Sequence, residues 1–166
     1  MFVINLGIAL GAGLYESRIV VPQWIASSAT SAQRWNAEAA RQANTGLNFW
    51  VFVTTVPLTV LTVANLVAAR RARGPTRRWW MSAALAAAAE RAFTFAYFVP
   101  TMLKLMRAES LPEPQAVALA LQWASLNHVR HAIVLTAWLA ALKTFSLLYE
   151  RREFADKDAR LFSPNR

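Results

Sequence analysis

The chain contains no cysteine. This absence excludes a disulfide-stapled scaffold, a thiolate zinc site, an iron–sulfur cluster and a cysteine nucleophile. Charge is also scarce, because Asp, Glu, Lys and Arg make up 16% of the 166 residues, against about 25% in an average soluble domain. Hydrophobic residues, by contrast, reach 56%. This length and composition predict one domain embedded in a membrane.

Four stretches have the length and apolar character of a membrane-spanning helix, which needs roughly 20 residues. They cover approximately residues 2–26, 46–69, 79–103 and 121–149. The sequence therefore predicts an all-α fold, an integral membrane four-helix bundle formed by residues 1–149, with a charged cytoplasmic tail at 150–166. An alternative interpretation makes residues 1–31 a signal peptide, but the basic segment that opens such peptides is missing.

The net charge of +9 follows from where the arginines lie. Arg70, Arg71, Arg73, Arg77 and Arg78 gather between the second and third stretches, and the C-terminal tail is also basic. Cytoplasmic loops have such an excess, so both termini and this loop are expected in the cytoplasm of a multi-pass protein of the bacterial inner (plasma) membrane. The expected partners are the lipid bilayer and a lipophilic small molecule, with no nucleic acid and with a homo-oligomer permitted.

Two further patterns concern the ends of the helices. Tryptophans occur at the predicted outer ends (Trp24, Trp50 and Trp123) and at an inner end (Trp79 and Trp80), which indicates interfacial belts. The connection between the first two spans contains no helix breaker over residues 31–44 and predicts a short surface helix.

Ionisable side chains lie inside the spans, where they are costly and by default mark a site or a pathway. They are Glu16 and Arg18 in the first span, Glu90 and Arg91 in the third, and His128, Arg130 and His131 in the fourth. At a rise of about 1.5 Å per residue, Glu16, Arg130 and His131 lie ~11–15 Å from the outer ends of their helices and Glu90 ~18–20 Å. Three helices therefore bring charge to a similar depth.

Helical periodicity adds one polar stripe to each span. In the second span the stripe includes Asn48 and Phe52, in the third Glu90, Thr94 and Tyr97, and in the fourth Asn127 and His131. A bundle with these stripes inward has a polar cavity toward its outer end. Its expected substrate-binding residues are Asn48, Phe52, Thr94 and Tyr97.

Two chemistries fit such a cluster. Carboxylate and imidazole together suit a transition metal (iron, copper, zinc or manganese), with Glu16, Glu90, His128 and His131 as candidate ligands, although their spacing is not diagnostic. With no metal cofactor, Glu16 or His131 is a general base and Arg130 or Asn127 stabilises the oxyanion that forms.

Two readings without catalysis stay open. The charges fit structural ion pairs of a non-catalytic membrane subunit, with Glu16 paired to Arg130 and Glu90 to Arg18 or Arg91. An intramembrane Glu or His also suits a small proton-coupled transporter.

Three short segments resemble the anthrone oxygenase-like family of small four-helix membrane proteins. They are Gly11-Ala-Gly-Leu-Tyr-Glu16, Tyr97-Phe-Val-Pro100, and Trp123 followed by Leu126-Asn127-His128-Val129-Arg130. The resemblance implies an oxygenase that deprotonates the ring methylene of an anthrone and combines the carbanion with dioxygen to give a quinone. The family positions that match are Glu16, Tyr97, Asn127 and Arg130.

The combined prediction is a membrane-embedded oxidoreductase, an oxygenase of a small lipophilic anthrone-, phenol- or quinone-like substrate. Its site is a Glu/His/Arg/Asn cluster in the outer half of the bundle. The expected catalytic residues are Glu16, Tyr97, Asn127, Arg130 and His131.

Overall fold

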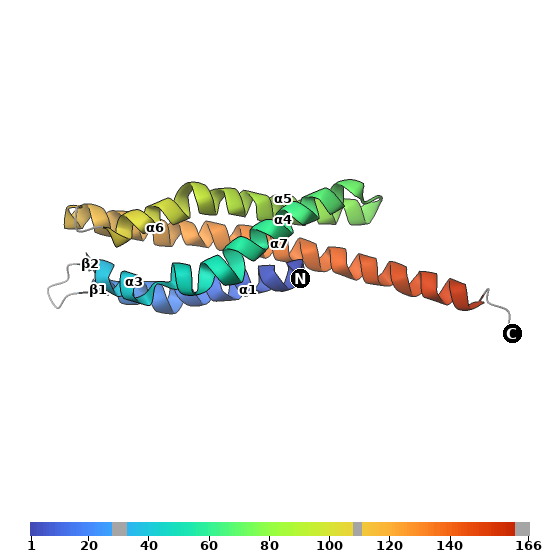
Figure 1. Ribbon diagram of the computed structural model, residues 1–166, viewed down its shortest axis with the longest axis horizontal. Helices are drawn as coiled ribbons and strands as arrows, with labels where there is room; N and C mark the ends of the chain where they lie inside the picture. Colours follow the sequence, from blue (N-terminus) through green and yellow to red (C-terminus); the bar gives the residue numbers. More distant parts are fainter. Residues whose placement is uncertain (28–32, 108–110, 162–166) are drawn as a thin grey trace.

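Four long helical segments make up most of the structure, a computed structural model that describes residues 1–27, 33–107 and 111–161 (Figure 1). The first segment comprises α1 (Phe2–Tyr15), the π-helix η1 (Glu16–Val20) and α2 (Val21–Trp24). The second comprises the π-helix η2 (Gly46–Thr55) and α4 (Val56–Arg71). The third comprises α5 (Pro75–Phe93), the π-helix η3 (Thr94–Phe98) and α6 (Val99–Met106), and the fourth is α7 (Glu113–Leu161). The predicted helical class is thus confirmed.

The connection between the first two segments differs from the helix expected at 31–44. Strand β1 (Ile25–Ser27) pairs antiparallel with β2 (Gln33–Trp35), and α3 covers only Ala37–Ala43. The helix starts after Asn36, whose Oδ1 accepts a hydrogen bond from the backbone N–H of Ala39 at 2.9 Å, and such a cap competes with helix further upstream. It ends at Asn44, which has a left-handed backbone with φ of 41°. Residues 31 and 32 lie outside the described residues.

Small residues let the segments approach one another closely. Helix α7 packs against α5 and α1, and α4 packs against α5 and α1. Alanines dominate the contact between α5 and α7, with Ala83, Ala87 and Ala137 fully buried, and this is how membrane helices pack. One apolar cluster forms around these alanines, and a second, around Trp24, Phe98 and Trp123, lies toward the β1–β2 end.

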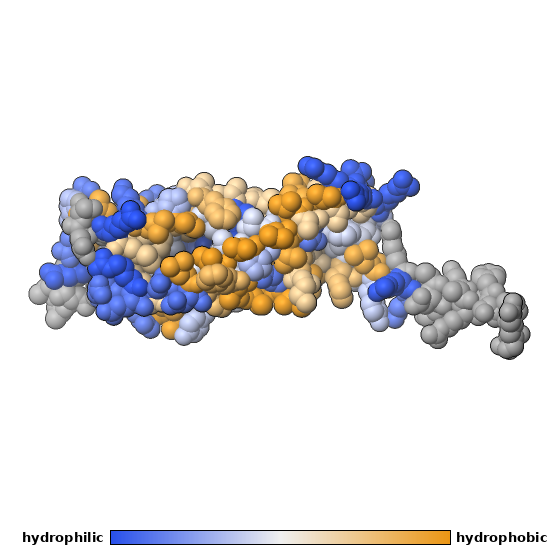
Figure 2. All heavy atoms as spheres, in the orientation of Figure 1, coloured by the Kyte–Doolittle hydropathy of each residue, from blue (hydrophilic) through white to orange (hydrophobic). Residues whose placement is uncertain are grey.

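Three helices are long and apolar enough to cross a membrane, namely Phe2–Trp24, Gly46–Arg71 and Glu113–Glu150. Figure 2 shows an apolar middle section with hydrophilic residues gathered at both ends. The stretch expected at 79–103 is not among the three within the described part of the chain. Glu90 and Arg91 stand side by side at its centre and lower its mean hydropathy, although each is buried inside the protein.

Each π-helix ends two residues before a proline. Val20 precedes Pro22, Thr55 precedes Pro57 and Phe98 precedes Pro100. Proline has no N–H to bond the carbonyl four residues earlier, so the ladder is broken there, and π-type turns are one form that a broken ladder takes. At the second π-helix, the freed carbonyl of Val53 accepts a hydrogen bond from Asn5 Nδ2 at 2.9 Å.

Candidate active site

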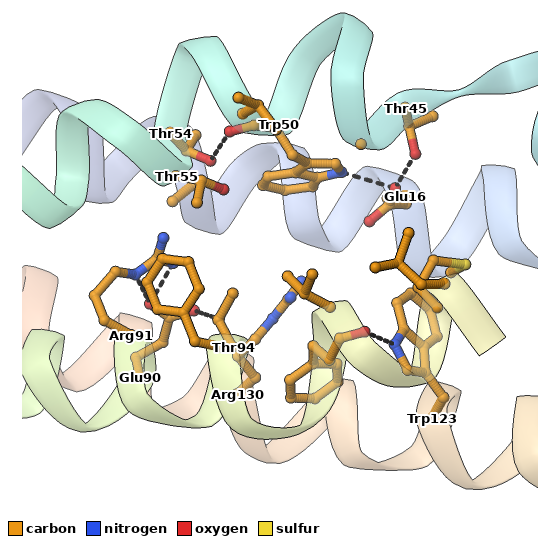
Figure 3. A pocket seen from close by; sticks show the side chains of 18 of the residues that line it. Glu16, Thr45, Trp50, Thr54, Thr55, Glu90, Arg91, Thr94, Trp123 and Arg130 are labelled. Atoms are coloured by element: carbon orange, nitrogen blue, oxygen red, sulfur yellow. Dashed lines mark hydrogen bonds and ion pairs between the residues drawn. The ribbon is translucent and has the colours of Figure 1, made fainter. Parts of the chain in front are cut away.

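A cavity of about 410 Å³ lies between the first two segments and the last two (Figure 3). All three π-helices contribute to its wall, and π-type turns occur frequently at functional sites. Most of the lining is apolar. The charged and imidazole side chains that reach the cavity are those of Glu16, Glu90, Arg91, Arg130 and His131. The prediction that three helices bring charge to one place is therefore matched by the placement of these residues.

Glu16 lies at the start of η1 and is 7% exposed. Its Oε1 accepts hydrogen bonds from Thr45 Oγ1 and from Trp50 Nε1, both at 2.8 Å (Figure 3). Neither donor carries a charge, so the carboxylate is held by hydrogen bonds and not by an ion pair among the described residues. The two bonds connect the first helical segment to the second.

Glu90 and Arg91 form a buried ion pair within α5. Arg91 Nε donates to Glu90 Oε2 at 2.6 Å, Arg91 Nη2 reaches the same oxygen, and Thr94 Oγ1 donates to Glu90 Oε1 at 2.8 Å. Of the two partners that the sequence allows for Glu90, the structure selects Arg91, whereas Arg18 is exposed. The remaining nitrogen, Arg91 Nη1, is buried and has no hydrogen-bond partner among the described residues.

Arg130 reaches the cavity from α7 between two aromatic rings. Its Cζ lies 4.6 Å from the centroid of Phe98 and 5.7 Å from that of Trp50. Cation–π contacts of this kind stabilise a desolvated guanidinium. Within the residues that the structure describes, Arg130 forms no ion pair, so the expected pair with Glu16 is not present. The guanidinium is therefore available to an anion in the cavity.

His131 is 6% exposed and packs against α1, where it faces Gly13. A Cβ at Gly13 would lie 2.7 Å from His131 Nε2, so only glycine leaves room for the ring there. Neither ring nitrogen has a hydrogen-bond partner in the described part of the chain. His128 is exposed, and its ring centroid is 6.4 Å from that of His131.

The positions of the described residues do not support the metal site predicted from the sequence. Among residues 1–27, 33–107 and 111–161, no group of three or more His, Asp or Glu side chains lies close enough to hold one ion. Of the four candidate ligands, His128 does not line the cavity, and Glu90 is already bonded by Arg91 and Thr94.

Four other expected site residues lie outside the cavity lining. Asn127 is buried and donates from Nδ2 to the carbonyl of Trp123, one turn earlier on its own helix. Tyr97 stacks on the Phe93 ring with centroids 5.8 Å apart, and its hydroxyl has no partner among the described residues. Asn48 is exposed, and Phe52 is 72% exposed.

The absence of Asn48 and Phe52 from the cavity lining has a physical cause. The polar stripe was drawn with the period of an α-helix, but residues 46–55 form a π-helix with i→i+5 hydrogen bonds, which rotates the chain relative to α4. Trp50 and Thr54 consequently face the cavity in place of Asn48 and Phe52. In the sequence, Pro57 is the residue that could have indicated this π-helix.

Two of the tryptophans expected at the outer interface are buried inside the protein instead. Trp24 and Trp123 are 3% and 5% exposed and pack in the second apolar cluster. Trp50 binds Glu16, as described above. Neither this contact nor that of Thr45 was predictable from the sequence, because both residues reach Glu16 only across the space between two helices.

Comparison with known proteins identifies the family. The family model for anthrone oxygenase matches residues 49–140, which is more than half of the chain. The matched segment contains Trp50, Glu90, Arg91, Arg130 and His131, whereas Glu16 precedes it. No curated protein and no solved structure matches the chain. On the strength of the family match, the chain belongs to the anthrone oxygenase family.

Proposed function

We propose that this protein is a membrane oxygenase that oxidises a small, lipophilic, anthrone- or phenol-like molecule in the cavity beside Arg130. The observation that carries the proposal is the Arg130 guanidinium, which reaches a mostly apolar cavity and has no carboxylate partner among the described residues. A guanidinium that has no ion-pair partner and lies in a mostly apolar cavity favours a ligand that becomes negatively charged during the reaction. Membership of the anthrone oxygenase family supports an oxygenase.

The proposed arrangement in the membrane is a four-helix bundle in which residues 79–103 also cross the membrane, as the third span along the chain. The pairing of Glu90 with Arg91 supports this, since a neutralised pair inside the protein costs less in lipid than two separate charges. The start of α1, the end of α7 and the α4–α5 turn lie toward the same end of the molecule, away from β1 and β2 (Figure 1). We place this end in the cytoplasm of a bacterial cell, because the turn is rich in arginine.

The proposed reaction begins with removal of a proton from the ring methylene. The electron pair of the broken C–H bond delocalises onto the ring oxygen, where Arg130 stabilises the negative charge. The carbanion then transfers electrons to dioxygen and forms a C–O bond, which gives a hydroperoxide once a proton is added. Loss of water, with the second methylene hydrogen, leaves a carbonyl. One dioxygen is consumed, and one quinone and one water are formed.

His131 is the proposed base, with Glu16 as the alternative. Both nitrogens of His131 are unpartnered in the described structure, so a lone pair faces no competing donor. Glu16 Oε1 already accepts two hydrogen bonds. We assign Glu16 with Trp50 to fixing the wall of η2 against η1 and to orienting the substrate.

The test is oxygen uptake and quinone absorbance with an anthrone, using purified protein in nanodiscs and protein-free nanodiscs as the blank. We expect Arg130→Gln to lower the rate by about 10²- to 10³-fold, as removal of an oxyanion donor does. The exposed Arg18→Gln is the matched control. Formation of quinone at the blank rate by the unmodified protein, or an unchanged rate in Arg130→Gln, would overturn the proposal.

A second pair of variants tests the base. We expect His131→Gln to lower the rate by about 10²- to 10⁴-fold, the usual contribution of a general base. His128→Gln, three residues away and exposed, should leave it unchanged. A large loss in Glu16→Gln with full activity in His131→Gln would transfer the role of base to Glu16.

A further inference from the structure

One side of the cavity is both open and apolar. Four of its lining residues are strongly exposed: Leu47 at 57%, Leu103 at 51%, Phe95 at 49% and Val99 at 39%. Leu47 belongs to η2, and the other three belong to η3 and α6. The opening therefore lies between the second and third helical segments, and its rim carries large hydrophobic side chains on both sides.

The path of the second segment explains why this side is open. Its α4 part packs against both α5 and α1, whereas its η2 part packs against α1 (Figure 1). The π-helix and Pro57 mark the point at which the segment leaves α5. The outer half of this segment consequently diverges from η3 and α6, and the cavity occupies the space between them (Figure 3).

At the β1–β2 end of the molecule, helix α3 packs against α2 and α6, with Ala40 fully buried. Trp35 Nε1 donates to the carbonyl of Leu105 at 2.9 Å, and Arg41 Nη1 donates to the carbonyl of Met106 at 2.8 Å. These bonds join β2 and α3 to the last turn of α6 and so fasten both in place.

We propose that the opening between η2 and α6 is an entrance from the lipid, through which a neutral planar aromatic molecule reaches Arg130. An uncharged ligand crosses the rim of Leu47 and Leu103 at little cost, whereas an anion would lose its hydration there without a partner. The ligand becomes an anion only inside, next to the guanidinium. This proposal takes only the class of ligand from the proposed function, because entry itself requires no oxidation.

The absence of cysteine allows a direct test. Leu103→Cys places a single thiol on the rim, and Leu85→Cys is the matched control, because Leu85 is 56% exposed on α5 and does not line the cavity. In nanodiscs, an apolar maleimide should label both variants faster than a charged one does. Anthraquinone, an unreactive planar aromatic, should slow the labelling of Leu103→Cys only. Leu47→Cys on the opposite rim repeats the test independently.

A bulky maleimide left on the thiol then acts as a plug. We expect plugged Leu103→Cys to take up anthraquinone at least about tenfold more slowly than the unlabelled variant, measured by stopped-flow quenching of tryptophan fluorescence, which corresponds to a barrier higher by about 1.4 kcal/mol. Plugged Leu85→Cys should be unaffected.

The outcomes distinguish a failure of the proposed entrance from a failure of the proposed oxygenase. Equal uptake by plugged and unplugged Leu103→Cys, faster labelling by the charged maleimide, or no binding of anthraquinone by any variant would overturn the entrance. Slow uptake by the plugged variant, in a protein that forms no quinone from anthrone, would uphold the entrance and overturn the oxygenase. Quinone formation at an undiminished rate by the plugged variant would uphold the oxygenase and overturn the entrance.

Discussion

Replacement of Gly13 by alanine tests the packing of His131 against α1. The added methyl carbon would lie 2.7 Å from Nε2 and 3.1 Å from Cδ2 of His131, closer than non-bonded atoms approach. Either α1 moves away from α7 or the imidazole leaves its position in the cavity. Overpacking of this kind costs about 1–3 kcal/mol.

Gly11 provides a control on the same helix. It is exposed, and a Cβ at Gly11 would meet nothing within 4 Å. Alanine is favoured over glycine in a helix interior by roughly 0.5–1 kcal/mol, so Gly11→Ala should stabilise the protein by that amount. Because the same helix-propensity gain applies to Gly13→Ala, the difference between the two variants isolates the overpacking cost of about 1–3 kcal/mol.

The assay is reversible unfolding in mixed micelles, followed by tryptophan fluorescence, together with the rate of quinone formation. In the double variant of Gly13→Ala with His131→Ala, the ring that obstructs the methyl group is gone. We expect a coupling energy of about 1 kcal/mol or more between the two positions, as contacting residues show. Equal stability of the Gly13→Ala and Gly11→Ala variants, or independent effects of Gly13 and His131, would refute this packing.

Two further perturbations address the buried polar contacts, both measured by the same unfolding assay. Glu90→Gln removes the counter-charge of the buried Arg91 and should cost about 3–5 kcal/mol, whereas a cost below about 1 kcal/mol would mean that water reaches the pair. Asn5→Leu leaves the Val53 carbonyl without its donor and should cost about 1–3 kcal/mol. Addition of Pro57→Ala restores an N–H four residues after Val53 and should recover part of that loss, and no recovery would contradict the role given to this proline.

The placement of the helices was largely predictable from the sequence. Runs of apolar residues follow directly from the thickness of a bilayer, so the first and second stretches were found within two residues of their observed bounds. The fourth stretch lies inside the longer helix Glu113–Glu150. The depth of Glu16, Arg130 and His131 follows from the constant rise of a helix, and all three reach the same cavity. The residues quoted for the family resemblance led to the family that the comparison shows.

The tertiary structure alone decided which side chains meet. The spacing left Arg18 and Arg91 open as partners of Glu90, and the structure pairs it with Arg91. Arg130 takes aromatic partners in place of a carboxylate. The π-helix before Pro57 rotates Trp50 inward, and a constant period of 3.6 residues does not describe that rotation. Composition and spacing determine how far along a helix a residue lies. The direction in which it points across the bundle depends on how the helices turn and cross.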